Sequence, residues 1–451
     1  MKKLFRFGLA ALSLVAMVIA SGCSDKRTSN LLGVVGDDAE AVAFFRPVDL
    51  LKSLGAKTDG GTLTAPAAAK EFFPNADVLK FKGIDYNLAA FAAYDDAPNT
   101  VMIAAIKDAD ALASSLKKLD YEKNSVGGKD VYMKDGNALL ILDGQLIAFD
   151  CFDESDLEEL VENIIDRSKK PLNGWKQDLL MARSGKTIYG VIPVDEKIDF
   201  IDADFDGMVA FDANLNGTKA EVNVNLYDNK GKVIMLSEVL GEDLAPIGNL
   251  SEHICNDAQI VYAFGGFIDE SIFARFLDFY RMPISDMDNV DLLRGLAANI
   301  NINSLDRRGN PDIESMQVSG AVSIAEGKAH RVLKDMIDLL KDVGARVKSK
   351  GDEYIITVGE TKVTTREDGD AVVFALGDEF SGSHPSVGDC LAYAAINIPA
   401  DHPLLNQFAD LGVGLKGNLK VMESSIHVEL DLIDSDQPFL QKLYSVTKDI
   451  Y

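Results

Sequence analysis

The 451-residue sequence predicts an α+β protein, with antiparallel sheets that carry helices on one face and two duplicated halves. Three observations predict this class. Apolar and polar residues alternate with a period of two, Asp-Gly pairs separate such segments, and motifs of the first half recur about 200 residues later. Hairpins should therefore dominate the strand pairing, and the few amphipathic segments should form the helices.

Five pairs of segments carry the repetition. They are 38–44 with 257–264, 103–106 with 321–324, 143–149 with 368–374, 187–195 with 391–401, and 220–226 with 426–432. The last pair alternates strictly, which is typical of antiparallel strands with one buried and one solvated face. Amphipathic or capped segments predict helices at 49–54, 108–119, 153–167, 271–280, 328–343 and 437–448.

The repetition also sets the predicted domains. A signal peptide covers 1–22, and a polar segment without periodicity, 23–36, is expected to be a tether. The first α+β half covers 37–248 and the second covers 249–451. Gly241, Pro246 and Asn249 break the pattern near this boundary. Each half has the usual size of a domain.

The first 22 residues have the pattern of a bacterial secretion signal. Three cations precede an apolar run over 9–20, and Ser21-Gly22 stand directly before Cys23. The run is shorter than the about 20 apolar residues that a spanning helix needs. The pattern looks like a lipobox, which implies cleavage before Cys23 and diacylation of its thiol. The alternative is an ordinary signal peptide with a chance cysteine.

The charge of the mature chain limits its partners. Residues 1–22 hold three cations and no anions, so 42 Lys and Arg face 71 Asp and Glu, a net charge of −29. Such a surface repels nucleic acid and anionic lipid, so neither is an expected partner. Besides Cys23, the chain has Cys151, Cys255 and Cys390, each in an apolar context. We expect these three to be buried free thiols.

The chain resembles the uncharacterised lipoproteins of Bacteroides-type bacteria, a family defined only as a domain of unknown function. The resemblance covers the lipobox, the opening Val34–Ala39, the segment Phe45–Leu51 and the overall length. It implies a Gram-negative cell envelope, with the protein lipid-anchored in the outer membrane. In that family an acidic run after the lipidated cysteine favours export to the surface. Here residues 24–27 are mixed in charge, so the periplasmic and surface leaflets both stay open.

Two phosphate-binding patterns occur in contexts that argue against such a site. Residues 412–417 spell GxGxxG, but they follow an amphipathic segment and lead into an expected strand, the reverse of a dinucleotide site. Residues 184–187 end like a P-loop but also run from helix to strand. Both are interpreted as turns. His427 alternates with Glu429 and Asp431 on a strand face that we expect to be solvated.

One segment is a candidate calcium site. Asp202, Asp204 and Asp206 are followed by Gly207, like the first half of a calcium loop, in which alternate carboxylates supply oxygen ligands. Ala213 stands where the bidentate glutamate belongs, and no helix is expected to follow. The alternative is a solvated acidic turn without metal.

These observations favour a lipid-anchored cell-envelope protein that is a noncatalytic binding or assembly module. Its membrane contact would run through the lipid on Cys23, and its further partner would be an unidentified protein or small molecule. The alternative is an envelope hydrolase with a carboxylate-based site between the two halves. Carbohydrate capture is disfavoured, because the chain has one tryptophan and 8% aromatic residues.

Overall fold

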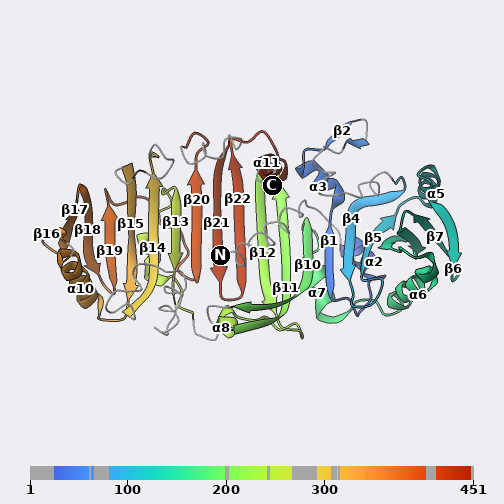
Figure 1. Ribbon diagram of the computed structural model, residues 1–451, viewed down its shortest axis with the longest axis horizontal. Helices are drawn as coiled ribbons and strands as arrows, with labels where there is room; N and C mark the ends of the chain where they lie inside the picture. Colours follow the sequence, from blue (N-terminus) through green and yellow to red (C-terminus); the bar gives the residue numbers. More distant parts are fainter. Residues whose placement is uncertain are drawn as a thin grey trace. The chain divides into compact units, whose positions relative to one another are not determined.

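A computed structural model describes residues 25–59, 62–64, 81–198, 203–240, 244–266, 292–305, 312, 315–342, 344–402 and 413–447 (Figure 1). The chain forms two compact units. Unit 1 comprises Met1–Val194, Asp206–Val233 and Asp436–Tyr451, and unit 2 comprises Asp195–Phe205 and Ile234–Ser435. The division therefore differs from the predicted halves 37–248 and 249–451. The C-terminal helix α11 (Phe439–Thr447) belongs to unit 1, where it packs against α3 (Pro47–Ser53) and Phe439 N–H donates to the Gly217 carbonyl at 3.0 Å.

Unit 1 is built on an antiparallel ladder. Its strands are β1 (Ala41–Phe45), β4 (Ile84–Ala93), β5 (Thr100–Ile106), β6 (Glu122–Val126), β7 (Lys129–Lys134), β8 (Asn137–Leu142), β9 (Gln145–Asp150), β10 (Ile188–Ile198), β11 (Ala203–Asn216) and β12 (Lys219–Tyr227). Eight of them pair in the order β6-β7-β8-β9-β5-β4-β1-β10. β11 and β12 form a hairpin, and the Thr187 N–H before β10 donates to the Ala213 carbonyl of β11. A small separate hairpin joins β2 (Lys57–Asp59) and β3 (Thr62–Thr64).

The helices of unit 1 include those that the sequence predicts. They are α2 (Asp25–Leu32), α3, α5 (Ala109–Lys118), α6 (Leu157–Ser168) after the 3-10 turn η2 (Glu154–Asp156), α7 (Gly174–Ala182) and α11. The predictions at 49–54, 108–119, 153–167 and 437–448 are confirmed. The Asp108 carboxylate caps α5 by accepting from Ala111 N–H at 2.9 Å. α7 is the helix expected before residues 184–187, whereas α2 was not predicted.

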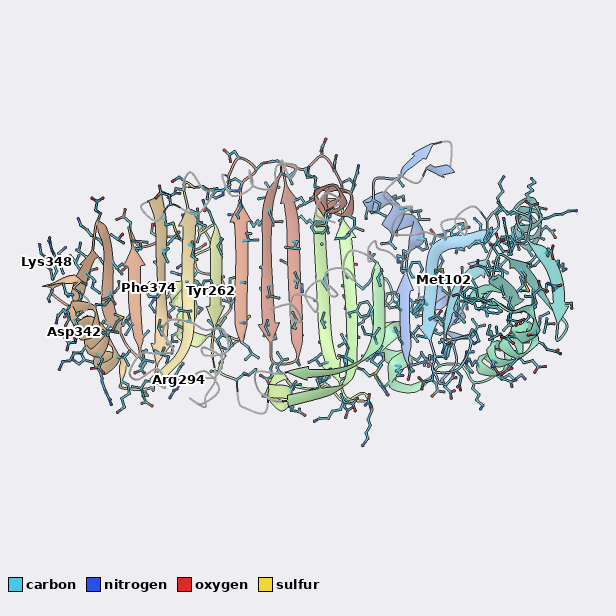
Figure 2. The ribbon with its side chains drawn as sticks, viewed as in Figure 1. Met102, Tyr262, Arg294, Asp342, Lys348 and Phe374 are labelled. Atoms are coloured by element: carbon cyan, nitrogen blue, oxygen red, sulfur yellow. The ribbon has the colours of Figure 1, made fainter. Side chains whose placement is uncertain are left out.

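Helices cover both faces of the unit 1 ladder, so the prediction of helices on one face is wrong here. Successive side chains of a strand point to opposite faces. Leu139 of β8 packs with Leu112 of α5, whereas its neighbour Leu140 packs in the cluster that contains Val161 of α6. Strands buried on both faces are continuously apolar, as 138–142 are. The cover is incomplete towards the middle of the ladder, where Met102 of β5 is 39% exposed (Figure 2).

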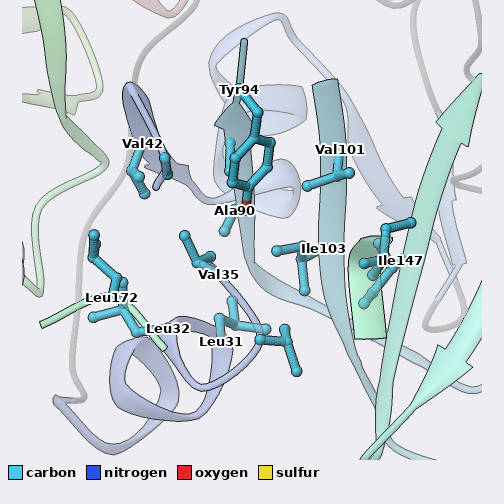
Figure 3. Close-up of a cluster of buried hydrophobic side chains, with 14 of the residues drawn as sticks. Leu31, Leu32, Val35, Val42, Ala90, Tyr94, Val101, Ile103, Ile147 and Leu172 are labelled. Carbon is cyan, nitrogen blue, oxygen red and sulfur yellow. The ribbon is translucent and has the colours of Figure 1, made fainter. Parts of the chain in front are cut away.

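The segment expected to be a tether is part of the unit 1 core from Asp25 onward. It forms α2, and Leu31 and Leu32 are each 1% exposed. Figure 3 shows both leucines with Val35 beside Val42 and Ile103 of the ladder. The tether prediction is therefore wrong for residues 25–36. The helix has only two apolar residues at its end, and contacts with the sheet rather than helix propensity stabilise it.

Two polar contacts fix α2 and the residues that follow it. The Thr28 and Tyr189 hydroxyls hydrogen-bond at 2.6 Å inside the core, and the Tyr189 ring stacks on Phe44 with centroids 5.0 Å apart. Past the helix, Gly36 N–H donates to the Tyr94 hydroxyl at 3.1 Å. The Arg167 guanidinium of α6 lies 3.9 Å from the Tyr94 ring centroid. α2 is thus held near its start and beyond its end.

Unit 2 contains a second antiparallel ladder. Its strands are β13 (Ile260–Phe264), β14 (Leu293–Ile302), β15 (Met316–Ile324), β16 (Arg346–Lys350), β17 (Glu353–Val358), β18 (Thr361–Asp368), β19 (Ala371–Leu376), β20 (Ala392–Ile398), β21 (Gly414–Met422) and β22 (Ser425–Ile433). They pair in the order β16-β17-β18-β19-β15-β14-β13-β20-β21-β22.

Three helical segments of unit 2 are described. They are α8 (Leu236–Leu240), the 3-10 helix η3 (Gly248–His253) and α10 (Ala329–Asp342), of which α10 confirms the prediction at 328–343. The helix predicted at 271–280 lies outside the described residues. Leu333 of α10 packs with Val372 of β19, and Leu250 of η3 packs in the cluster that contains Val373. Because Val372 and Val373 face opposite ways, α10 and η3 cover opposite faces. Among the described residues, no helix of either unit is long and apolar enough to cross a membrane.

The buried hydroxyl pair gives a direct test of how α2 is held. Thr28→Val keeps the shape of the side chain but removes the partner of the Tyr189 hydroxyl. We expect a loss of about 1–2 kcal/mol in the free energy of unfolding, measured by urea denaturation. Ser29→Ala, at an exposed position of the same helix, should change it by less than about 0.5 kcal/mol. Equal effects of the two substitutions would contradict the contact.

Candidate functional site

A buried polar cluster of unit 1 joins the turn after α7 to the β11–β12 hairpin. α7 ends at Ala182, and Gly185 in the following turn has a φ of +104°, a conformation that favours glycine. The turn presents Arg183 and Lys186 before β10 begins. The hairpin contributes Asp212, which lies opposite Asn223 in the register.

The carboxylate of Asp212 is at the centre of this cluster. Its side chain is 10% exposed, and its two oxygens lie 3.5 Å from Arg183 Nε and 3.3 Å from Lys186 Nζ. Asn223 Nδ2 donates to Asp212 Oδ1 at 2.9 Å, and Arg183 Nη2 donates to Asn225 Oδ1 at 2.9 Å. A buried carboxylate is tolerated when it is paired and hydrogen-bonded in this way.

The cluster ties a turn to a sheet and does not form a phosphate cradle. Arg46, which is also buried, donates from Nε to the Lys186 carbonyl at 3.0 Å, so the turn is held from a second side. The chain runs from α7 through the turn into β10, which confirms that residues 184–187 are not a P-loop. Gly414 and Gly417 of the GxGxxG pattern lie in β21, which confirms that this pattern leads into a strand.

Unit 2 has a smaller polar arrangement on β21 and β22. Asn418 Nδ2 donates to Glu429 Oε2 at 2.8 Å, and His427 Nε2 lies 3.0 Å from Glu429 Oε1. The hydrogen bond from His427, followed by that from Asn418, lowers the pKa of the Glu429 carboxyl. The Glu429 side chain is 53% exposed, in line with the predicted solvated face, while that of His427 is 24% exposed. Solvent screening therefore keeps the contribution of this pair to stability small.

Three of the other histidines each contact a different partner. His330 Nδ1 lies 3.1 Å from Glu367, His384 Nδ1 donates to the Ile254 carbonyl at 2.6 Å, and His402 Nε2 donates to the Ile302 carbonyl at 2.6 Å. Burial lowers the pKa of His253. Two of these contacts join a ring nitrogen to a backbone carbonyl that is distant in the sequence, which is typical of a structural role.

The cysteine prediction is confirmed where the structure describes it. Cys151, Cys255 and Cys390 are buried free thiols, and burial raises the pKa of Cys151 and Cys390. Raised pKa values make these thiols poor nucleophiles at neutral pH. Cys23, the predicted lipidation site, lies outside the described residues.

The calcium candidate falls only partly within the described residues. Asp202 and the side chain of Asp204 lie outside them. Asp206 is exposed, and its Oδ1 accepts a hydrogen bond from Asn229 Nδ2 at 3.2 Å. From Ala203 onward the segment is strand β11 rather than a loop. Calcium binding at these three aspartates stays a prediction.

Comparison with known proteins adds no family. No protein-family model matches the chain, and no curated protein matches it. Among solved structures, crystal form I of TP0453 is similar with a TM-score of 0.30 and 12% identity over 48% of this chain and 86% of that chain. Crystal form IV of TP0453 gives a TM-score of 0.31 and 11% identity over 45% of this chain and 83% of that chain. These likenesses are too low to carry an argument about fold or function.

The Asp212 cluster predicts an asymmetry between two aspartates of one strand. Asp212→Asn should leave Arg183 and Lys186 without their counter-charge and lower the free energy of unfolding by about 3 kcal/mol. Asp206→Asn, at an exposed position of β11, should lower it by less than about 0.5 kcal/mol. Urea denaturation measures both values. Adding Arg183→Met to Asp212→Asn should recover part of the loss, and a full loss that persists would contradict the ion pair.

Proposed function

We propose that this protein is a lipid-anchored cell-envelope protein that serves as a noncatalytic binding or assembly module. The observation that carries the proposal is the position of α2, which begins two residues after the lipobox cysteine Cys23. A secretion signal that ends where the fold begins suits a protein whose body is fixed close to its anchor. The unidentified partner would be a protein or a small molecule.

The proposed anchor is a diacylated thiol on Cys23, which would be a new amino terminus after removal of 1–22. Stable anchoring takes more than one acyl chain, which a bacterial lipoprotein terminus supplies. The proposed location is the outer membrane, in line with the resemblance to Bacteroides-type lipoproteins. Residues 24–27 are mixed in charge, so they do not distinguish between the periplasmic and the surface leaflet.

We also propose that the two units descend from one duplicated domain. The unit 1 order β6-β7-β8-β9-β5-β4-β1-β10 has the same form as the unit 2 order β16-β17-β18-β19-β15-β14-β13-β20. In each unit one helix, α5 or α10, stands between the strands that correspond to β5 and β6. Each unit also has a following hairpin, β11–β12 or β21–β22.

Residue registers support the duplication at β1 and β10, where paired positions have the same offsets as the sequence motifs. Side by side across unit 1 lie Ala148, Met102, Phe91, Ala43 and Gly190. The same row in unit 2 reads Phe374, Gly320, Ala298, Tyr262 and Ala394 (Figure 2 labels Met102, Tyr262 and Phe374). Ala43 and Tyr262 are 219 residues apart, and Gly190 and Ala394 are 204 apart, as are the sequence motifs around them.

The polar clusters fit the same correspondence. Asp212 lies opposite Asn223 in unit 1, and 206 residues later Asn418 lies opposite Glu429, so acid and amide have exchanged places.

The two units also differ at the positions of the cations that pair with Asp212. At the offset of 204, Arg183 corresponds to Val387 and Lys186 to Cys390, both buried in an apolar cluster. The cations are therefore present in the unit that buries a carboxylate and replaced by apolar residues in the other.

The alternative, an envelope hydrolase, requires convergent carboxyl groups with raised pKa values. Among the described carboxyls, a raised pKa is found at Asp49, at the start of α3. Burial is the main cause, while the charges of Lys52 and Arg46 lower the pKa. Asp49 Oδ1 lies 3.9 Å from Lys52 Nζ, in the next turn of the same helix. A single carboxyl with a raised pKa is as consistent with a helix terminus as with a catalytic site. The binding or assembly module therefore remains our proposal.

Membrane attachment tests the proposed anchor. Cys23→Ala should abolish incorporation of labelled fatty acid and should either release the protein from membranes or leave it as an uncleaved precursor. Ser29→Ala, which alters an exposed position of α2, should leave labelling and attachment unchanged. Fractionation of cells with metabolic labelling measures both. A processed Cys23→Ala protein that stays on the membrane would sink the lipoprotein proposal.

A further inference from the structure

We infer that unit 1 rests on the phospholipid headgroups by one defined edge, at the start of α2. This edge, here called the α2 edge, consists of Arg27, Lys82, Asp85, Asn87 and Lys107. The inference rests on the proposed lipidation of Cys23 and deepens it. It assigns the side of unit 1 that faces the membrane.

The first step is the short connection between lipid and fold. Cys23 precedes Asp25 by two residues, so their Cα atoms lie at most about 7 Å apart. α2 itself cannot swing freely, because Thr28 is bonded to Tyr189 and Leu31 and Leu32 are buried. A lipid in the bilayer therefore brings the start of α2 to the headgroup region.

The second step identifies what surrounds the start of α2. Arg27 Nε lies 3.6 Å from the Asp85 carboxylate, which places the first turn of α2 beside the start of β4. Asn87 is exposed there, and its amide groups bond to Asp85 Oδ1. Lys107 N–H donates to the Gly83 carbonyl at 2.7 Å, so the end of β5 lies at the same edge with the exposed Lys107 and Lys82.

The third step fixes the opposite end. Gly36, after α2, bonds to Tyr94, directly after β4, so α2 and its continuation follow β4 along its length. β4 has ten residues, and at about 3.3 Å each its ends lie roughly 25–30 Å apart, allowing for its bulge. The exposed carboxylates Asp95 and Asp96 stand at this far end, away from the lipid phosphates.

The composition of the α2 edge suits zwitterionic headgroups. Cations and an acid alternate there, with Asp108 following Lys107, so both the phosphate and the amine of such a lipid find partners of opposite charge. Lysines at a membrane surface can also keep their alkyl stems against apolar surface while the ammonium stays hydrated. The exposed carboxylates Asp95 and Asp96 of unit 1 are then directed to the aqueous side.

The test compares two fluorophores on the lipidated full-length protein in phosphatidylcholine vesicles that carry a nitroxide on a fraction of the headgroups. One is attached at Asn87→Cys and the other at Asp95→Cys, both exposed positions. Cys151, Cys255 and Cys390 are buried and the Cys23 thiol would be acylated, so the unaltered protein should take up no label. We expect quenching at position 87 to exceed that at position 95 by at least about twofold, since the nitroxides lie at the headgroups.

A second pair, Lys107→Cys and Asp96→Cys, repeats the comparison in case one substitution disturbs folding. Equal quenching at both ends, or stronger quenching at 95 and 96, would overturn the assigned edge while leaving the lipid anchor intact. A protein that does not sediment with the vesicles would instead contradict the proposed function. The two failures are therefore distinguishable.

Discussion

The hydrogen bond between the buried hydroxyls of Thr28 and Tyr189 is the contact on which this account depends. It fastens α2 to β10, and the apolar end of α2 then completes the core between the sheet, α6 and α7. Arg167 holds the next segment through Asp38, at 3.2 Å, and the ring of Tyr94. The residues from Asp25 onward are therefore part of the fold, and a lipid on Cys23 would act on the orientation of unit 1 rather than on a loose chain.

On the proposed duplication, burial of charge accounts for the difference between the polar clusters of the two units. A carboxylate inside a protein needs counter-charges and hydrogen bonds, and Asp212 receives them from Arg183, Lys186 and Asn223. Its counterpart Asn418 is neutral, and its paired acid, Glu429, is exposed. Unit 2 therefore tolerates apolar residues at 387 and 390. In the proposed correspondence, a turn held by ion pairs in unit 1 matches a packed apolar loop in unit 2.

The sequence predicted what depends on local pattern. The alternation in 220–226 and 426–432 became β12 and β22, and the amphipathic segments gave α5, α6 and α10. It missed α2, because eight largely polar residues with two leucines carry no periodic signal and fold only against the sheet. The apolar run 138–142 indicates a strand that is buried on both faces, but we expected the strands of hairpins to be buried on one face only. The return of α11 to unit 1 and the pairing of Asp212 with Arg183 depend on long-range contacts that no spacing reveals.

Native-state hydrogen exchange tests most directly whether α2 belongs to the core of unit 1. If it does, the amides of Leu31 and Leu32 should open only with the whole unit and exchange about as slowly as that of Ile103 in β5. Both segments should then respond to denaturant with the same slope. Exchange of the α2 amides orders of magnitude faster than that of Ile103, with β4 and β5 still protected, would show a frayed leader and contradict the account.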